Sequence, residues 1–205
     1  GINWQVRIMA LNIFPRFIEG QVSDAIRGID YAIKKGAHII NASWGAGPTD
    51  ITEDEFQLLK EAIKKAQDHG ILFVAAAGNS GTSNEKKGDI PASFDLDNIV
   101  SVGSFDRYTK PSSFSNYGKT SVDLFAPGEE IYSTLTGKDY GYKSGSSMAA
   151  PMATGIAALL LANDNSLDFK SIKEILMDSC QPAPALKDLS RCGGALSAEK
   201  ALAHP

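Results

Sequence analysis

Small hydroxyl residues stand directly before an apolar stretch in the sequence SGSSMAAP, residues 144–151. The Gly-Ser-Ser turn leads into MAAPMATGIAALLLAN, which is apolar on nearly every side and is therefore typical of a buried helix. Ser147 would lie where this helix begins, and free backbone N–H groups and the helix dipole favour developing negative charge there. A serine in such a place could act as the nucleophile of an acyl transfer.

Two other loops are rich in glycine and small residues and follow apolar runs. These loops are ASWGAG, residues 42–47, and AAAGNSG, residues 75–81, with Asn79 at the tip of the second. In parallel α/β sheets the loops at the carboxyl ends of the strands carry the chemistry. An asparagine amide beside the backbone N–H of Ser147 would form a site for the oxyanion of acyl transfer.

Each of these patterns also has a purely structural interpretation. Gly-Ser-Ser before a helix commonly supplies a turn and an N-cap, and Gly-Asn after a strand commonly forms a turn with positive φ. The nucleophile-elbow pattern Gly-x-Ser-x-Gly fails, because Ala149 stands where its second glycine is needed. Spacing alone leaves both an ordinary α/β domain and a hydrolytic one open.

The surrounding sequence predicts alternating strands and helices that would position these loops. Apolar runs predict strands at residues 6–13, 37–44, 71–78, 98–105 and 121–128. Helical periodicity covers residues 20–36, and a capping-box pair, Thr52 and Glu55, opens a second helix that ends at Gly70. This order predicts the α/β class, with a parallel β-sheet flanked by helices on both faces.

Composition narrows the classes of partner. With 205 residues, of which 43% are hydrophobic and 21% charged, the chain is long and apolar enough for one globular domain. A net charge of −4 gives no basic surface for nucleic acid. No uninterrupted apolar run reaches the roughly 18 residues of a membrane span. The two cysteines, Cys180 and Cys192, leave a disulfide and an unpaired buried thiol equally open.

Together these segments resemble the subtilisin-like serine proteases. GSSMAAP is similar to the family motif Gly-Thr-Ser-Met-Ala-x-Pro, with Ser146 in place of threonine, AAAGNSG to the oxyanion-asparagine segment, and NASWGAG to the substrate-binding strand. The similarity continues through IPASFDLDNIVSVGSFD, SSFSNYG, VDLFAPGEEIYST and CGGALSAEKAL. The resemblance implies a three-layer sandwich whose N-terminal portion lies outside the chain, so that residues 1–205 form a single, partial peptidase domain.

The resemblance also assigns roles to residues. Ser147 would be the nucleophile of a serine endopeptidase, and Asn79 would hold the oxyanion together with the Ser147 backbone N–H. Residues 17–20 and 43–45 would pair with an extended peptide or protein substrate. The implied substrate-binding residues are Ile18, Glu19, Gly20, Ser43, Trp44, Gly45, Ala75, Ala76, Ala77, Gly78 and Asp89.

Asp89 would lie at the base of the pocket for the side chain before the scissile bond. There it would pair with lysine or arginine, or else turn outward into solvent with the charged loop NEKKGD. The resemblance implies a cis bond between Ile90 and Pro91. The resemblance implies calcium only for the full-length protein, since no metal site is evident in the sequence of this chain. It also favours a secreted or extracytoplasmic location.

Two motifs of the family's catalytic triad are absent from this sequence. The Asp-[Ser/Thr]-Gly and His-Gly-Thr-His motifs do not occur, and none of His38, His69 and His204 matches the catalytic position. The chain is therefore expected to be inactive alone. Three explanations stay open, in this order: the C-terminal part of a longer protease, a half that needs a separate N-terminal part of the domain, and a non-catalytic pseudo-protease that binds peptides.

Overall fold

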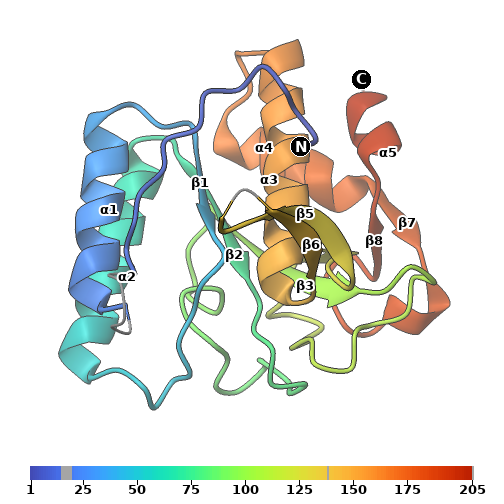
Figure 1. The fold of residues 1–205 in the computed structure, drawn as a ribbon, viewed down its shortest axis with the longest axis horizontal. Helices are drawn as coiled ribbons and strands as arrows, with labels where there is room; N and C mark the ends of the chain where they lie inside the picture. Colours follow the sequence, from blue (N-terminus) through green and yellow to red (C-terminus); the bar gives the residue numbers. More distant parts are fainter. Residues whose placement is uncertain (15–19, 138, 205) are drawn as a thin grey trace.

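A computed structural model describes residues 1–14, 20–137 and 139–204 of the chain (Figure 1). Its centre is a six-stranded sheet in the order β1-β2-β3-β4-β8-β7. The strands are β1 (Ile39–Ala42), β2 (Leu72–Ala76), β3 (Ile99–Phe105), β4 (Leu124–Pro127), β7 (Cys180–Pro182) and β8 (Gly194–Leu196). Neighbours from β1 to β8 pair in parallel, and only β7 pairs antiparallel, with β8. The predicted parallel sheet is confirmed.

Helices cover both faces of this sheet. Alternate side chains of β2 point to opposite faces, as in any strand. Phe73 packs with α1 (Val22–Lys34) and α2 (Glu53–Asp68). Val74 packs with α3 (Ser146–Asn163), α4 (Phe169–Asp178) and α5 (Ala198–Leu202). The α/β class with helices on both faces is therefore confirmed.

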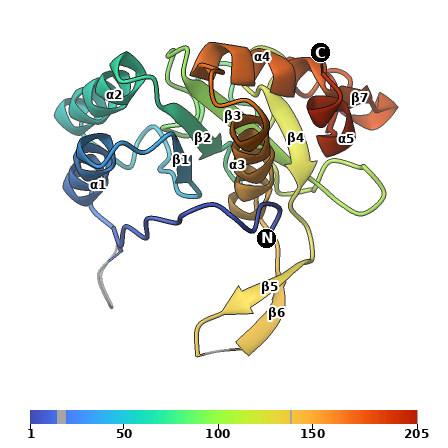
Figure 2. The ribbon, with the colours of Figure 1, turned by 90° about the horizontal axis from the view of Figure 1, so that it is seen from above.

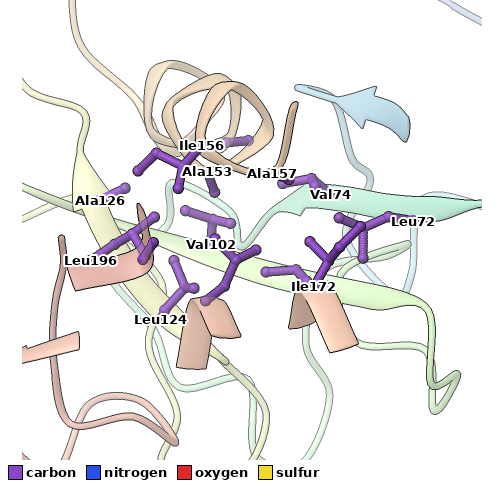
Figure 3. Close-up of a cluster of buried hydrophobic side chains, with 14 of the residues drawn as sticks. Leu72, Val74, Val102, Leu124, Ala126, Ala153, Ile156, Ala157, Ile172 and Leu196 are labelled. Atoms are coloured by element: carbon purple, nitrogen blue, oxygen red, sulfur yellow. The ribbon is translucent and has the colours of Figure 1, made fainter. Parts of the chain in front are cut away.

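The helix α3 is the centre of the larger hydrophobic cluster (Figure 3). Ala153 and Ala157 are fully buried and let the helix approach the sheet closely, beside Val74, Val102 and Leu124. By length and composition alone α3 is apolar enough to cross a membrane, which corrects the expectation from the sequence. Its packing against β1, β2, β3 and β4 is that of the core helix of a globular domain.

Local sequence signals account for the ends of the first two helices. Thr52 caps α2 by accepting from the backbone N–H of Glu55, and the Glu55 side chain accepts from the backbone N–H of Thr52. Gly36 and Gly70, which follow α1 and α2, have φ of +69° and +74°, a region where glycine costs least. The predicted capping box and both helix ends are confirmed.

Two antiparallel strands, β5 (Ile131–Leu135) and β6 (Asp139–Lys143), project from the body as a hairpin (Figure 2). The sequence reading did not include this hairpin. Its second strand leads directly into α3, so the hairpin delivers the chain to the serine-rich turn. Near the C-terminus, Cys180 and Cys192 form a disulfide, which settles the alternative left open by the sequence.

The strand predicted at residues 6–13 is wrong. Residues 1–14 run as an exposed segment from α3 to α1 (Figures 1 and 2), where Ile2 lies against Gly155 and Ile13 against Gly28. A strand needs a neighbour for its backbone N–H and C=O groups. Among the described residues the segment pairs with no strand, and β1 forms the edge of the sheet on that side.

Candidate active site

Ser147 lies in the first turn of α3, half-buried, two residues after the N-cap Gly145. The turn is placed by two backbone hydrogen bonds, from Gly145 N–H to the Gly128 carbonyl at 2.8 Å and from Met148 N–H to the Gly145 carbonyl at 2.9 Å. The loop after β4 therefore anchors the start of the helix. Ser147 stands at the positive end of the helix dipole.

Asn79 lies at the exposed tip of the loop that follows β2, and Ser146 fixes its side chain. The Asn79 carboxamide oxygen accepts hydrogen bonds from the Ser146 backbone N–H at 2.8 Å and from the Ser146 hydroxyl at 2.9 Å. The same hydroxyl oxygen accepts from the Gly78 N–H at 3.2 Å. Because the oxygen of the amide is engaged in this way, its NH₂ group remains the free end.

Two nitrogen atoms that carry N–H groups lie near each other beside the serine. A methyl carbon placed on Gly145 would lie 3.6 Å from Asn79 Nδ2, 3.6 Å from the backbone nitrogen of Ser147 and 3.7 Å from Asn79 Oδ1. The two nitrogens are therefore candidates to donate to one oxygen atom. Paired donors of this kind, in front of a nucleophile, stabilise the oxyanion of a tetrahedral intermediate.

A cavity of about 320 Å³ opens in front of these groups. It is lined by Trp44, Gly45, Ala46, Gly47, Asp50, Ala76, Gly78, Asn79, Ser80, Asp89, Ser146 and Ser147. A larger cavity of about 570 Å³ lies between residues 84–97 and the ion pairs of Asp123 with Lys173 and Arg191, and Ser147 is not part of its lining. The smaller cavity is the candidate active site, because it contains the serine and the oxyanion donors.

Asp89 contributes a carboxylate to this cavity instead of turning outward. It packs against Gly78, where φ is +113° and a Cβ atom would lie 2.2 Å from Asp89 Oδ2, so only glycine leaves it room. Partial burial, and then the negative charge of Asp50, raise the pKa of Asp89 above its ordinary value. The bond between Ile90 and Pro91 is cis, as the resemblance implies.

The structure brings together only some of the residues that the resemblance assigns to substrate binding. Trp44, Gly45, Ala76, Gly78 and Asp89 line the cavity with Ser147 and Asn79. The others lie elsewhere: Ala75 and Ala77 are fully buried in the cores, Ser43 accepts a hydrogen bond from Asn41, and Gly20 precedes α1. Ile18 and Glu19 lie outside the described residues.

No histidine stands near the serine. His38, His69 and His204 are all exposed, and none lines the cavity. His38 directly precedes β1. Within residues 1–14, 20–137 and 139–204, no three His, Cys, Asp or Glu side chains are grouped closely enough to hold a metal ion.

Sequence reasoning missed the role of Ser146 and the contribution of Asp50. Ser146 replaces the threonine of the motif that this chain resembles, and a threonine has the same hydroxyl. The hydroxyl that serine shares with threonine is the feature of the sequence that could have predicted the role of Ser146. Asp50 follows a glycine-rich loop, and its carboxylate accepts from the Gly47 N–H at 2.8 Å. Such a contact within a loop leaves no periodic pattern in the sequence.

Comparison with known proteins gives a consistent result. The profile of the subtilase family matches residues 1–194. The chain is 40% identical over 179 residues to a thermophilic serine proteinase of Bacillus sp. (strain AK1) and 43% identical over 141 residues to the major intracellular serine protease of Bacillus subtilis (strain 168). These alignments cover 87% and 69% of the chain, and the chain spans 42% of the length of each relative.

Solved structures show the same relationship. The prenylagaramide maturation protease PagA superposes with a TM-score of 0.77 at 31% identity, over 91% of this chain and 68% of that one. A lanthipeptide protease superposes with a TM-score of 0.80 over 94% of this chain and 68% of its own, at 24% identity, a likeness that concerns the fold alone.

Proposed function

The chain belongs to the subtilase family, and on that premise we propose that its parent protein is a serine endopeptidase that forms an acyl-enzyme on Ser147. The observation that carries this proposal is the placement of Asn79 Nδ2 and the Ser147 backbone nitrogen near each other beside the serine. Ser146 holds the Asn79 amide in that orientation before any substrate arrives. Donors fixed in advance need no reorganisation when charge develops.

The chemistry follows from this arrangement. Ser147 Oγ attacks the carbonyl carbon of the scissile peptide bond and gives up its proton, and the carbonyl oxygen becomes an oxyanion between the two N–H donors. Collapse of this intermediate breaks the C–N bond and releases the amine with a proton. Water then hydrolyses the ester on Ser147. The residues that line the cavity hold the side chain before the scissile bond.

All three histidines of the chain lie away from the cavity, which supports a proton acceptor from outside residues 1–205. We propose that it belongs to a part of the catalytic domain that precedes Gly1 in the parent protein and packs on the β1 side of the sheet. Among the described strands β1 is at the edge of the sheet, which supports this proposal. So does the row of exposed apolar side chains in residues 1–14, among them Trp4, Ile8 and Phe14.

We further propose that the protein works outside the cytoplasm. The support is the disulfide between Cys180 and Cys192, because such bonds persist in oxidising compartments. Two relatives are named intracellular proteases, so family membership alone does not decide the location.

A second candidate function is a non-catalytic domain that binds peptides in the same cavity. The absence of a histidine beside Ser147 in this chain favours it. The same fold can serve catalysis or binding, so the fold does not separate the two. Reactivity of the serine does, because only an activated serine reacts with an electrophile.

The test is covalent labelling of the full-length parent protein with a serine-directed phosphonate. We expect one phosphonate per molecule, attached to Ser147 and located by peptide mass spectrometry. Ser147→Ala should abolish labelling, whereas Ser133→Ala, which changes an exposed serine on β5, should leave it unchanged. An unlabelled Ser147, with a control protease labelled in parallel, would exclude the endopeptidase in favour of the binding domain.

A further inference from the structure

A segment of the chain far from the active-site loops in sequence lies directly behind the loop that carries Asn79. Residues 114–117 pair with residues 78–84 through main-chain hydrogen bonds. These are Gly81 N–H to the Phe114 carbonyl at 2.7 Å, Asn116 N–H to the Gly78 carbonyl at 3.0 Å, Tyr117 N–H to the Thr82 carbonyl at 3.1 Å and Asn84 N–H to the Tyr117 carbonyl at 2.8 Å. Residues 114–117 are therefore bonded to this loop along its length.

The side chain of Asn116 adds contacts to the part of the loop that follows Asn79. Its carboxamide oxygen accepts from the Ser80 N–H at 2.9 Å and from the Thr82 N–H at 3.3 Å. Its NH₂ group donates to Asn84 Oδ1 at 3.1 Å. Asn84 in turn donates to the Ala77 carbonyl at 2.8 Å. Asn116 and Asn84 are buried, so the bonds between Asn116 and Asn84 and between Asn84 and Ala77 are shielded from water, whereas Ser80 and Thr82 are exposed.

Two independent anchors thus define where the Asn79 amide lies. Ser146 fixes the orientation of the side chain, and Asn116 fixes the main chain on either side, at the Gly78 carbonyl and the Ser80 N–H. A loop tip without the second anchor would be exposed and free to move. Catalysis is sensitive to such movement, since a displacement of about 1 Å can cost about 100-fold in rate.

We propose that Asn116 is a positioning residue for catalysis, which holds the oxyanion donor Asn79 in place through the main chain of residues 78–82. This inference rests on the proposed endopeptidase function. Asn116 does not line the cavity and has no hydrogen bond to Ser147 in the described structure, so its side chain acts on the reaction through the loop that carries Asn79.

A buried asparagine could instead serve only the stability of the fold. Asn98 is such a residue: it is equally buried and donates to the Ile71 carbonyl at 3.0 Å, where β2 and β3 begin, at the other end of the sheet. Asn98→Ala is therefore the matched control. It removes a buried amide of the same type without touching the loop of Asn79.

The test is a double-mutant cycle on the full-length parent protein, with turnover of a peptide substrate as the readout. We expect Asn116→Ala to lower kcat about 10- to 100-fold with KM changed little, because the donor acts mainly on the transition state. In an Asn79→Ala background the same substitution should change kcat less than about threefold, since the group it positions is gone. Asn98→Ala should lower activity by the same factor in both backgrounds.

An equal loss for Asn116→Ala in both backgrounds would overturn the inference and leave a structural role. Should that variant not fold, Asn116→Ser replaces it in the same cycle. Hydrogen exchange gives a readout that does not depend on activity: Asn116→Ala should speed exchange of the amides of residues 80 and 82 selectively, and a uniform increase across the core would contradict the proposal. If wild-type protein neither turns over substrate nor labels at Ser147, the proposed function fails, and exchange alone decides on the positioning role.

Discussion

The environment of the Asp89 carboxylate bears most directly on the choice of substrate. It lines the cavity in front of Ser147, half-buried, with the carboxylate of Asp50 also in the lining. Partial burial raises the pKa of Asp89, and the charge of Asp50 raises it further, because both disfavour the ionised form. A cationic group in the cavity relieves both penalties. We therefore expect the cavity to take lysine or arginine side chains.

This expectation is tested with peptides that differ only at the residue before the scissile bond. The full-length protein should cleave after arginine with a higher kcat/KM than after phenylalanine, and Asp89→Asn should lower that ratio at least tenfold. Asp95→Asn, which changes an exposed carboxylate of a neighbouring loop, should leave it unchanged. A preference for phenylalanine or leucine that persists in Asp89→Asn would show that the carboxylate plays no part in specificity.

The same preference should depend on pH in one direction. Protonated Asp89 attracts no cation, so the ratio should fall as the pH is lowered through the pKa of Asp89 in the free enzyme. Because that pKa is raised, the midpoint should lie above the value of about 3.9 for an unperturbed aspartate. The stability of the fold depends on pH in the opposite direction. Because the pKa of Asp89 is raised in the folded chain, its contribution to the free energy of unfolding is fully present below the ordinary pKa of aspartate. This contribution is lost as the pH rises through the raised pKa.

At the scale of elements, the sequence predicts long elements better than short ones. The capping box of α2 and the fully apolar run of β2 are local signals, and both elements form where expected. Strands β7 and β8 have three residues each, too few for a period to be seen. Residues 6–13 have the composition of a strand but lack a neighbouring strand among the described residues. The local sequence cannot show whether a neighbouring strand is present.

The features of the candidate site also fall into two groups, those that the sequence predicts and those that it does not. Ser147 and Asn79 stand in glycine-rich loops after apolar runs, which a sequence displays directly. The hydrogen bond that Ser146 donates to Asn79 joins residues 67 positions apart, and the one that Ser80 donates to Asn116 joins residues 36 positions apart. Contacts of that kind depend on how the strands are ordered in the sheet. They could not be read from spacing along the chain.

The disulfide acts on the short elements near the C-terminus. It joins Cys180 of β7 to Cys192, just before β8, across a sequence separation of 12. Replacing both cysteines by serine in the parent protein should lower the free energy of unfolding by about 2–4 kcal/mol, because the open loop gains entropy in the unfolded chain. Chemical denaturation measures this, and reduction of the wild type should give a similar shift.

Two observations would contradict this prediction. One is an unchanged denaturation midpoint in the double variant. The other is a pair of alkylatable thiols at positions 180 and 192 in protein isolated from its native source, which would also contradict the proposed location outside the cytoplasm.

At the scale of the whole molecule, the chain holds half of the reaction centre that we propose for the parent protein. Ser147, Asn79 and the cavity in front of them lie together, whereas the three histidines are exposed elsewhere. In the part of the chain that the structure describes, β1 is an edge strand of the sheet, and the exposed apolar segment of residues 1–14 lies on the same side. An open edge and exposed apolar side chains favour association with another segment of chain.

We accordingly expect the purified 205-residue chain to turn over peptide no faster than its own Ser147→Ala variant. Loss of the base alone costs about 10⁶ in kcat, a value measured in subtilisin, a member of this family. The full-length parent protein, assayed in parallel, should be active. Turnover by the isolated chain that Ser147→Ala abolishes would mean that a base within residues 1–205 had gone unrecognised.

The placement of the two tryptophans of the chain gives the molecule an internal optical signal. Trp4 is 89% exposed on the N-terminal segment, whereas Trp44 lines the cavity in front of Ser147. Indole emission shifts to shorter wavelength when water around the ring is displaced. Filling the cavity should therefore change the emission of Trp44, and covering residues 1–14 should change that of Trp4. Phenylalanine at either position separates the two signals, so substrate binding and completion of the domain can be followed independently and without a label.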